Sequence, residues 1–567
     1  MTYTPIITEQ RFLLDHIVKL EELASHERFA DATPDMVEAI LVGAGEFAAE
    51  EYAPTNRVGD THYPVWKDGV VTMPPGFKQA YQNFVANGWG SLNGPTDFGG
   101  QGLPYALYTA LIEDLGTANM GFTLINILTP GAIESLVHHG TPEQQAKWLP
   151  KLVSGEWNGT MNLTEPQAGS DVGALKTTAT PITEGEHTGK YKIKGTKIFI
   201  TFGEHDLTDN IVHLVLARTP EAPEGTRGIS LFIVPKYHVN DDGSIGDAND
   251  VRCVSIEHKL GIHGSPTCVM SYDGAKGWLI GKENGGMAAM FTMMNNARLA
   301  VGMQGVGVGE AALQKAVEYA AEREQFGPII RHADVRRMLA TSRAEIFAAR
   351  AIGLACATAL DMATATGDAD WAARGALLTP IAKAYGTDVG CRVADTAVQV
   401  HGGMGYIEET GAAQFLRDVR ITPIYEGTNG IQAMDLVGRK MMDGGAAAQA
   451  LLDEIMDYAR ANSQLCPTRV EALWKAAETM SEATARLVES DMDVRNAAAV
   501  PYLSAFARVL GAYFHLKAAV AGGEDETLLA RIYIDRILPR YRSDLIEAAA
   551  GVADLDAISD RALGLPG

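Results

Sequence analysis

The amino-acid sequence predicts an α+β protein that is mostly helical. Helical spacing of apolar residues dominates the first 157 residues, strand-like runs gather between residues 158 and 280, and helical spacing returns from residue 281 onward. Helices and strands segregated along a chain are typical of α+β folds, whereas a doubly wound sheet needs them to alternate. We therefore predict a small β domain between helical domains.

The composition is that of a globular protein with several domains. The chain has 567 residues, 46% of them hydrophobic, and its 47 basic and 70 acidic side chains give a net charge of −23. At roughly 150 residues per domain, three or four compact units are expected. Such a negative chain is repelled by phosphate backbones and anionic lipid, which argues against nucleic acid or a membrane as a partner.

The cysteines and the N-terminus indicate a cytoplasmic location. Five cysteines are scattered without a close C-x-x-C pair, which argues against a disulfide scaffold or a zinc ribbon. No basic leader followed by an apolar stretch opens the chain. No apolar run reaches ~18 uninterrupted residues, so we expect no membrane-spanning helix. No H-E-x-x-H pattern occurs, and no metal site is expected.

The domains are predicted in order from periodicity and turn residues. In the first helical segment, apolar side chains recur at Val37, Leu41 and Ala44. Five strand-like runs in the next segment predict a small antiparallel β-barrel or sandwich. The long proline-free stretch 333–363 predicts a helix of bundle length. The predicted divisions are an N-terminal extension (1–35), a helical domain (36–157), a β-barrel (158–280), a four-helix bundle (281–445) and an additional C-terminal helical domain (446–567).

Two motifs in the strand segment offer groups for a polar ligand. In LTEPQAGSD, proline and glycine force a turn with Ser170 at its tip, which presents a hydroxyl and backbone N–H groups or is an ordinary turn. In GTKIFITFG, Phe199 stands near Thr201, an arrangement that suits a flat ring with a polar edge. Packing in the core explains Phe199 equally well.

Two motifs in the bundle segment are candidates for phosphate and ring binding. In EREQFG, Arg323 is a forked donor for a phosphate and Phe326 a stacking ring, or the pair is a solvated arginine and a buried phenylalanine. In VHGGMGY, Gln399 precedes Gly402 and Gly403, where backbone can approach a ligand without side-chain obstruction.

Two further glycine-containing motifs differ in what they predict. GVGVGE, residues 305–310, lacks a preceding strand and the dinucleotide-binding spacing, so we interpret it as close packing of two helices. In IYEGTNGIQ, Thr428 is a candidate N-cap of a following helix. Glu426 lies among apolar neighbours near that helix start, where it is either a structural cap or a tuned base.

Together these motifs, in this order, resemble the acyl-CoA dehydrogenase superfamily over roughly residues 37–442. The resemblance implies FAD held without a Rossmann domain, in a cleft between the strand domain and the helical bundle. It also implies that neighbouring subunits of a homo-oligomer share the cofactor site.

The resemblance assigns cofactor and substrate contacts residue by residue. The implied FAD contacts are Leu163, Thr164, Gly169, Ser170, Phe199, Thr201, Arg323, Phe326, Gln399, Gly402, Gly403 and Thr428, with Phe199 where many members have tryptophan. The implied substrate contacts are Ser170, Arg298, Tyr425 and Gly427. Gly430 stands where several members have a glutamine on the FAD side, so one cofactor hydrogen bond is expected to be missing.

Glu426 matches the family's catalytic base. Some members carry the base immediately before an arginine on a helix, but here that position is Ala297, so Glu426 is expected to act alone. The implied reaction removes a proton next to the thioester carbonyl and transfers the β-hydrogen as hydride to flavin N5. The base's own backbone N–H and a flavin ribityl hydroxyl would stabilise the developing enolate oxygen.

The two ends of the chain narrow the resemblance. The N-terminal segment and the extra C-terminal domain are similar to the branch that converts 3-methylmercaptopropionyl-CoA to methylthioacryloyl-CoA in dimethylsulfoniopropionate degradation. The implied electron acceptor is electron-transfer flavoprotein. Because the extra domain can replace the second dimer of the family's usual tetramer, a homodimer is expected.

Other functions stay open. A general short- or medium-chain acyl-CoA dehydrogenase and an acyl-CoA oxidase share this fold, and a flavin-free scaffold would lack the yellow chromophore. A DNA-binding alkylation-response relative would need a basic C-terminal domain. Residues 446–567 hold 12 basic and 18 acidic side chains, a net charge of −6, which argues against DNA.

Overall fold

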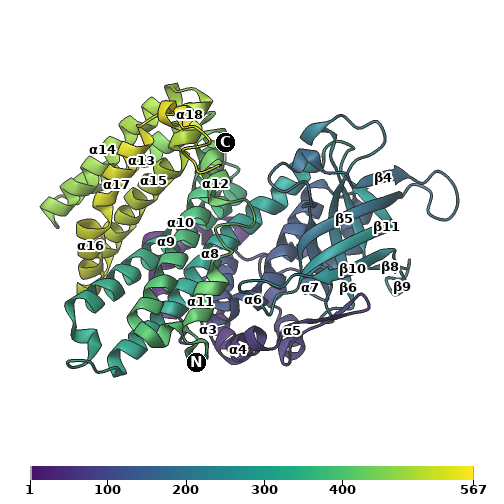
Figure 1. Cartoon of the computed structure of the whole chain (residues 1–567), viewed down its shortest axis with the longest axis horizontal. Helices are drawn as coiled ribbons and strands as arrows, with labels where there is room; N and C mark the ends of the chain where they lie inside the picture. The colour runs from purple at the N-terminus through teal and green to yellow at the C-terminus, as the bar shows by residue number, and fades with distance from the viewer. Residues whose placement is uncertain (1–2, 566–567) are drawn as a thin grey trace. The chain divides into compact units, whose positions relative to one another are not determined.

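The computed structural model describes residues 3–565, which fold as two compact units. The first unit contains the residues up to Ile6 together with 35–300, and the second contains 7–34 together with 301 onward. Figure 1 shows all the larger strands within the first unit and long helices in both. Helical segments precede and follow the β-sheet domain along the chain, which confirms the predicted mostly helical α+β class. The five predicted domain boundaries stay a prediction.

The helices of the first unit precede its sheet. They are α3 (Pro34–Phe47), α4 (Ala53–Thr61), α5 (Phe77–Ala86), α6 (Tyr105–His139) and α7 (Pro142–Ser154), with a small hairpin of β1 (Val65–Lys67) and β2 (Val70–Thr72). The α6 helix is kinked where Asn119 leaves helical geometry. The Asn119 side chain accepts a hydrogen bond from Phe122 N at 3.1 Å and donates one to Thr55 Oγ1 at 2.8 Å, so it caps the second half of α6.

The β domain is one sheet in the order β3-β6-β7-β11-β5-β4, with β10 paired to β11. Its strands are β3 (Trp157–Asn162), β4 (Thr178–Pro181), β5 (Tyr191–Thr201), β6 (Asn210–Ala217), β7 (Ser230–Pro235), β10 (Val251–Ile256) and β11 (Thr267–Ile280), beside a hairpin of β8 (Tyr237–Val239) and β9 (Ile245–Ala248). The β6 and β7 strands are buried along their whole length, so they form the core.

The β4 end of this sheet approaches the chain directly after β6, the neighbour of the other end strand β3, as expected for a small barrel. Ala179 N of β4 donates to Arg218 O at 2.7 Å, and Arg218 N donates to Thr177 O at 2.9 Å, directly after the end of β6. The prediction of an antiparallel barrel or sandwich is wrong at one pair of strands, because β3 and β6 run parallel. The long connection between them, which contains β4 and β5, allows that parallel pairing.

The second unit is built on long helices. The bundle consists of the second half of α8 (Gly286–Glu322), α9 (Ala333–Thr366), α10 (Ala369–His401), and the shorter α11 (Ala412–Val419) and α12 (Asn429–Val437). A Cβ added at Gly305 of α8 would lie 2.5 Å from Gly386 O of α10, and one added at Gly302 would lie 2.7 Å from Ala382 O. The GVGVGE motif is therefore a site of close helix packing, as predicted.

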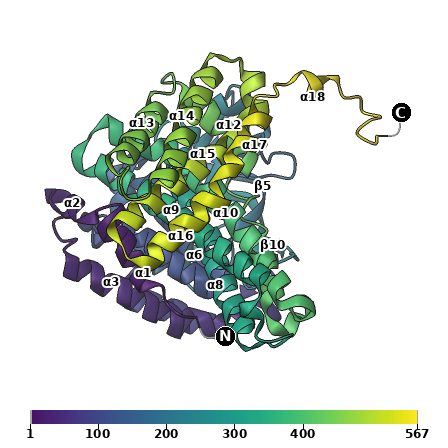
Figure 2. The same ribbon diagram turned by 90° about the vertical axis from the view of Figure 1, so that its left-hand side faces the viewer.

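The C-terminal helices pack on the bundle, and the N-terminal extension is held by a buried charge cluster. The helices are α13 (Ala446–Ala461), α14 (Pro467–Glu489), α15 (Met492–Ala521), α16 (Glu524–Arg536), α17 (Tyr541–Ala548) and α18 (Ala553–Ala557), and Figure 2 shows α18 on an extended final segment. The extension contains α1 (Ile7–Phe12), a π-helical turn (Leu13–Ile17) and α2 (Leu20–Ala24). Glu9 of α1 and Glu310 of α8 both pair with Arg343 and Arg350 of α9.

Three helices have the length and composition of a membrane span, contrary to the expectation from uninterrupted apolar runs. Tyr105–His139, Ala333–Thr366 and Met492–Ala521 are long and apolar enough to cross a membrane by length and composition. Occasional polar residues interrupt each apolar run, which is why a search for uninterrupted runs misses them. The most apolar 18-residue window of the first helix is 89% buried inside the protein, and that of each of the other two is 78% buried. The apolar side chains of these helices therefore belong to the core.

Candidate active site

The predicted site residues form two sets, one in each compact unit. The first unit holds Leu163, Thr164, Gly169, Ser170, Phe199, Thr201 and Arg298, and the second holds Arg323, Phe326, Gln399, Gly402, Gly403, Tyr425, Glu426, Gly427 and Thr428. Within each unit, residues far apart in sequence are brought together by contacts that no motif displays.

A buried ion pair holds the LTEPQAGSD loop. Lys197 Nζ of β5 lies 2.8 Å from Glu165 Oε1 and donates to Leu163 O at 2.9 Å, and both charged side chains are buried. Glu165 also accepts from Lys176 N at 2.7 Å and from the Thr177 hydroxyl at 2.6 Å. Burial alone raises the pKa of Glu165, but the Lys197 charge and these donors outweigh it and lower the pKa to about 2. Glu165 is therefore a charged anchor for the loop.

The LTEPQAGSD loop also lies against the last residues of β5, 199–201. Ile198 N donates to Thr164 O at 2.9 Å, which places Thr164 beside Phe199 and near the end of β5 at Thr201. Phe199 has a left-handed φ of +60° and a side chain that is 59% exposed, next to a β-bulge between β5 and β11. An exposed ring on a strained backbone does not fit the core-packing alternative and favours a surface that contacts a ligand.

The polar groups of this first set are available to a ligand. The hydroxyls of Thr164, Ser170 and Thr201 make no hydrogen bond within residues 3–565. A Cβ added at Gly169 would meet nothing within 4 Å, so the backbone there is open. Three hydroxyls and an open backbone near an exposed ring match the chemistry of a flavin, which has a flat ring and a polar edge.

The EREQFG motif forms a tight turn in the second unit. Gln325 N donates to Gly327 O and Ile329 N to Arg323 O, each at 2.9 Å, and Phe326 sits at the tip with a φ of +55°. The side chains of Arg323 and Phe326 are exposed to solvent, and Arg323 has no ion pair among the described residues. The alternative of a buried phenylalanine at position 326 is therefore wrong.

The end of α10 is similarly open. Gln399 is exposed in the last turn, and its side chain makes no hydrogen bond with any residue that the structure describes. A Cβ added at Gly402 or Gly403 would meet nothing within 4 Å. Tyr406 follows in the same 3-10 turn with an exposed ring. We did not predict Tyr406, although it closes the VHGGMGY motif.

Glu426 lies in a strained turn before α12. Its φ is +54° and that of Gly427 is +85°, so two consecutive residues have left-handed backbone. Gln432 Nε2 donates to the carbonyl oxygens of Glu426 and Gly427, each at 3.3 Å. Thr428 caps α12 by accepting from Ile431 N at 3.2 Å, which confirms its predicted N-cap role. The Glu426 side chain is half-buried.

A buried lysine completes the support of this turn. Lys383 of α10 is fully buried and its Nζ donates to Gly427 O at 2.8 Å and to Asn429 Oδ1 at 3.0 Å. Asn429 Nδ2 in turn donates to Thr387 Oγ1 at 3.0 Å and to Asp388 Oδ1 at 2.8 Å. The turn is thus fixed to α10 from within the bundle, which limits the positions that the Glu426 carboxyl can take.

Two predicted substrate contacts lie in different surroundings. The Tyr425 hydroxyl donates to Gln304 Oε1 of α8, and burial followed by the Glu426 charge raises the pKa of Tyr425 well above its usual value. This shift is upward from an ordinary value that already leaves a phenol neutral near pH 7. Arg298 is only 2% exposed, and its guanidinium donates to Asn295 Oδ1 at 3.3 Å, so its predicted role toward substrate stays a prediction.

Sequence reasoning missed the supporting residues, although two left a signal. Lys197 lies four residues after the buried Ile193 on β5. Side chains at even spacing point to the same face of a strand, so Lys197 faces the core. Lys383 is a lone charge in the apolar stretch LLTPIAKAYG. A charged residue at a core position is a candidate for a buried functional contact. Gln304 and Gln432 left no such signal.

Comparison with known proteins gives the class that this fold and site define. Family models of the acyl-CoA dehydrogenase N-terminal domain, middle domain and C-terminal domain match residues 35–156, 160–275 and 284–442, and an acetyl-CoA dehydrogenase C-terminal-like model matches 451–558. The chain belongs to the acyl-CoA dehydrogenase family and is an FAD-dependent oxidoreductase.

Particular relatives extend the comparison. The chain is 46% identical over 469 residues to 3-methylmercaptopropionyl-CoA dehydrogenase of Ruegeria pomeroyi, covering 80% of this chain and 79% of that protein. It resembles butyryl-CoA dehydrogenase of Megasphaera elsdenii, with a TM-score of 0.60, 28% identity, and 72% and 98% of the two chains covered. Acyl-CoA dehydrogenase of Bacillus anthracis, complexed with FAD, shares the fold at a TM-score of 0.72 and 22% identity, covering 95% and 91%.

The residues present fit FAD. The first set offers an exposed ring and hydroxyl donors for an isoalloxazine, and the second offers the Arg323 guanidinium and an open glycine backbone at Gly402 for phosphates. The individual FAD contacts stay predictions.

Proposed function

We propose that this protein catalyses the FAD-dependent α,β-dehydrogenation of an acyl-CoA thioester, 3-methylmercaptopropionyl-CoA, with Glu426 as the base. The observation that carries the base assignment is the turn at Glu426 and Gly427. Two left-handed residues are held there by Gln432 and by the buried Lys383, while the Glu426 carboxyl stays half-buried. Strain of this kind persists where the surrounding structure fixes it, and it is concentrated at functional sites.

The proposed step has a simple balance of atoms and electrons. The Glu426 carboxylate takes the proton from the carbon next to the thioester carbonyl, and a C=C bond forms as the β-hydrogen leaves with its electron pair. Bound FAD supplies the acceptor for that hydrogen. The backbone N–H of Glu426 is proposed to stabilise the negative charge that develops on the thioester oxygen. Exclusion of water by a bound acyl chain favours proton uptake by the carboxylate.

The neighbouring tyrosine is proposed to assist by staying neutral. The Tyr425 hydroxyl donates to Gln304, and a phenol is uncharged near neutral pH even before burial raises its pKa further. A neutral phenol beside Glu426 adds no repulsion when the carboxylate is charged. Glu426 then remains the group that gains and releases the proton.

The substrate proposal depends on similarity and is narrower than the family assignment. The 46% identical relative is a 3-methylmercaptopropionyl-CoA dehydrogenase, and the similarity extends over 80% of this chain. A general short- or medium-chain acyl-CoA dehydrogenase is the second candidate, favoured by the likeness to a butyryl-CoA dehydrogenase. Electron-transfer flavoprotein is the proposed acceptor, and an oxidase would use O₂ instead.

Glu426→Gln tests the base. The amide keeps the shape of the side chain but takes no proton, so we expect anaerobic flavin bleaching to slow at least ~100-fold while FAD and acyl-CoA binding persist. Glu409→Gln, a change at an exposed glutamate on the same unit, is the control and should leave the rate unchanged. Near-normal bleaching by the Glu426 variant would exclude it as the base.

A panel of thioesters tests the substrate. Anaerobic bleaching with 3-methylmercaptopropionyl-CoA should show a higher kcat/KM than with butyryl-CoA or octanoyl-CoA. Equal or better values for the plain acyl chains would favour the general dehydrogenase. Rapid recovery of the flavin colour on admitting air would instead indicate an oxidase.

A further inference from the structure

A hollow in the second unit contains none of the predicted cofactor or substrate residues. It has a volume of about 630 Å³ and is bounded by the end of α8, the start of α9 and α16. Its lining consists of Leu313, Val317, Ile330, Ala333, Arg336, Arg337, Leu339, Ala340, Thr341, Arg343, Leu529, Ile532 and Arg536. The volume lies within the range of about 300–1,000 Å³ that is usual for small-molecule sites.

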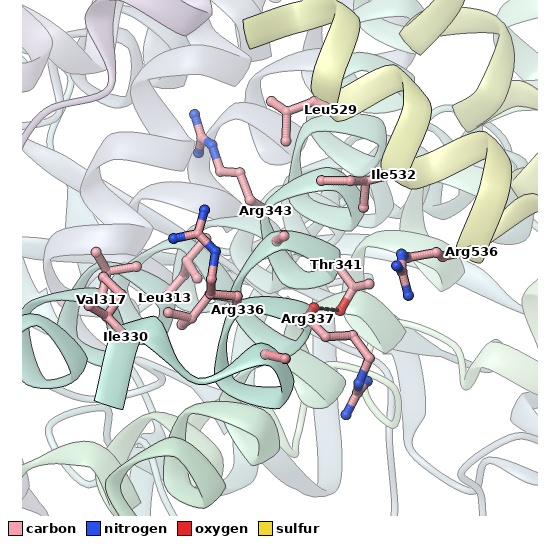
Figure 3. Close-up of a pocket in the computed structure, with 13 residues that line it drawn as sticks. Leu313, Val317, Ile330, Arg336, Arg337, Thr341, Arg343, Leu529, Ile532 and Arg536 are labelled. Atoms are coloured by element: carbon pink, nitrogen blue, oxygen red, sulfur yellow. Dashed lines mark hydrogen bonds between the residues drawn. The ribbon is translucent and has the colours of Figure 1, made fainter. Parts of the chain in front are cut away.

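The walls of the hollow are aliphatic. Leu529 and Ile532 come from α16, and Leu313 and Val317 come from α8 (Figure 3). Val317 is 40% exposed, although it is a large apolar side chain. The lining contains no aromatic residue among those described, so it offers no stacking surface for a nucleobase or flavin ring. These walls suit an alkyl chain.

The charges of the hollow are all positive. Its lining contains four arginines and, among the described residues, no aspartate or glutamate, in a chain of net charge −23. Arg343 is neutralised by Glu9 and Glu310, and Arg337, which extends away from Arg343 in Figure 3, pairs with Asp334. The two remaining guanidinium groups therefore decide the charge that the hollow presents.

Arg336 and Arg536 are these two remaining groups. Neither forms an ion pair or a side-chain hydrogen bond within residues 3–565, and both are exposed. They come from different helices, α9 and α16, which bound the same hollow (Figure 3). Unpaired guanidinium groups on two sides of an aliphatic hollow are complementary to an anion that has an alkyl body.

We propose that this hollow binds an aliphatic anion, a hydrocarbon chain with a carboxylate or phosphate head group. The head group is held by Arg336 and Arg536, and the chain lies against Val317, Leu529 and Ile532. None of the lining residues is a predicted flavin or acyl-CoA contact, so the proposal does not depend on the proposed function.

The test uses the full-length, FAD-loaded protein and defined probes. Calorimetric titration with dodecanoate and with dodecyl phosphate identifies the preferred head group, and dodecyltrimethylammonium provides the same chain with a positive head. We expect the anions to bind and the cation to bind at least about tenfold more weakly. Equal binding of all three probes, or no binding of either anion, would overturn the proposal.

Variants locate the bound anion. The double variant Arg336→Gln and Arg536→Gln should weaken binding at least about tenfold, as expected for losing hydrogen bonds from charged donors. Val317→Asp, a change at an exposed position, places a negative charge in the hollow and should have the same effect. Arg531→Gln is the matched control, because Arg531 is an exposed arginine of α16 that does not line the hollow.

Flavin content and steady-state kinetics distinguish this site from the cofactor and substrate sites. Retained FAD, unchanged kcat and KM in the variants, and binding that persists with saturating acyl-CoA are the expected results. Release of FAD on titration, competition with acyl-CoA, or unchanged anion affinity in both variants would overturn the proposal.

Discussion

At the scale of single residues, the site depends on buried charges that support exposed functional groups. Lys383 has no opening to solvent, yet its ammonium group binds the carbonyl oxygen of Gly427, one residue after the proposed base. Lys197 likewise binds Leu163 O and Glu165. Each lysine fixes a loop that presents other residues, so its role is positioning.

Lys383→Met tests the positioning role. The substitution keeps the length of the side chain but removes a charged donor, an interaction whose loss costs about 1.5–3 kcal/mol. We expect kcat to fall about tenfold to a hundredfold, with KM and FAD content little changed and the pH profile of kcat shifted. Lys475→Met on α14, at an exposed lysine, is the control for steady-state kinetics. An unchanged kcat and pH profile would show that Lys383 is only structural.

The lowered pKa of Glu165 makes the free energy of unfolding depend on pH in acid. Its folded pKa of about 2 lies below its unfolded value of about 4.3, so its stabilising contribution is complete above pH ~4.3 and is lost as pH falls toward ~2. The contribution is at most about 3 kcal/mol. Urea unfolding followed against pH should therefore show a steeper acid loss for the native protein than for Glu165→Gln. Parallel profiles would contradict this prediction.

At the scale of elements, close packing of α8 on α10 supports the position of the turn that contains the proposed base, Glu426. Gly305 and Gly386 leave no room for a Cβ between the two helices. The stretch of α10 at this contact also carries Lys383 and Thr387, which bind Asn429. Small residues on one face of a helix thus affect a loop that is distant in sequence.

Gly305→Ala is expected to destabilise this contact. The new methyl group would lie 2.5 Å from Gly386 O, so the backbones must separate, and overpacking of this kind typically costs about 1–3 kcal/mol. Urea unfolding measures the loss, and kcat should fall with it because the turn of the proposed base is attached to α10. Gly430→Ala is the control, since its Cβ would meet only Thr428 Oγ1 at 3.7 Å. Equal stability of both variants would refute the packing argument.

At the scale of the whole molecule, outward-facing side chains favour an assembly. Phe326, Tyr406 and Arg323 point away from the rest of the second unit. In the family resemblance, the corresponding groups contact the FAD of a neighbouring subunit. We therefore propose a homodimer in which each cofactor is held by two chains.

Sedimentation measures this assembly. The FAD-loaded protein should sediment with a mass of twice the chain's 60.6 kDa. Phe326→Ala should lower FAD retention and leave the free energy of unfolding almost unchanged. The exposed ring packs against nothing in its own unit, so its loss removes no contact there. A monomer that retains FAD, or a tetramer, would refute the proposed dimer.

The sequence by itself determined the fold class, the order of helical and strand segments, the family motifs and the cap at Thr428. Each depends on residues close together in the chain, whose periodicity or turn chemistry is visible locally. It also indicated that GVGVGE packs helices, because the glycines lacked the context of a phosphate loop.

Only the tertiary structure decided which side chains support the site and which face outward. Lys197 with Glu165, Lys383 with Gly427, and Tyr425 with Gln304 are contacts between residues 32 to 121 positions apart. The parallel pairing of β3 with β6 and the exposure of Phe199 likewise depend on the folded chain. Burial and pairing are properties of the environment that distant segments create, and local sequence does not contain that environment.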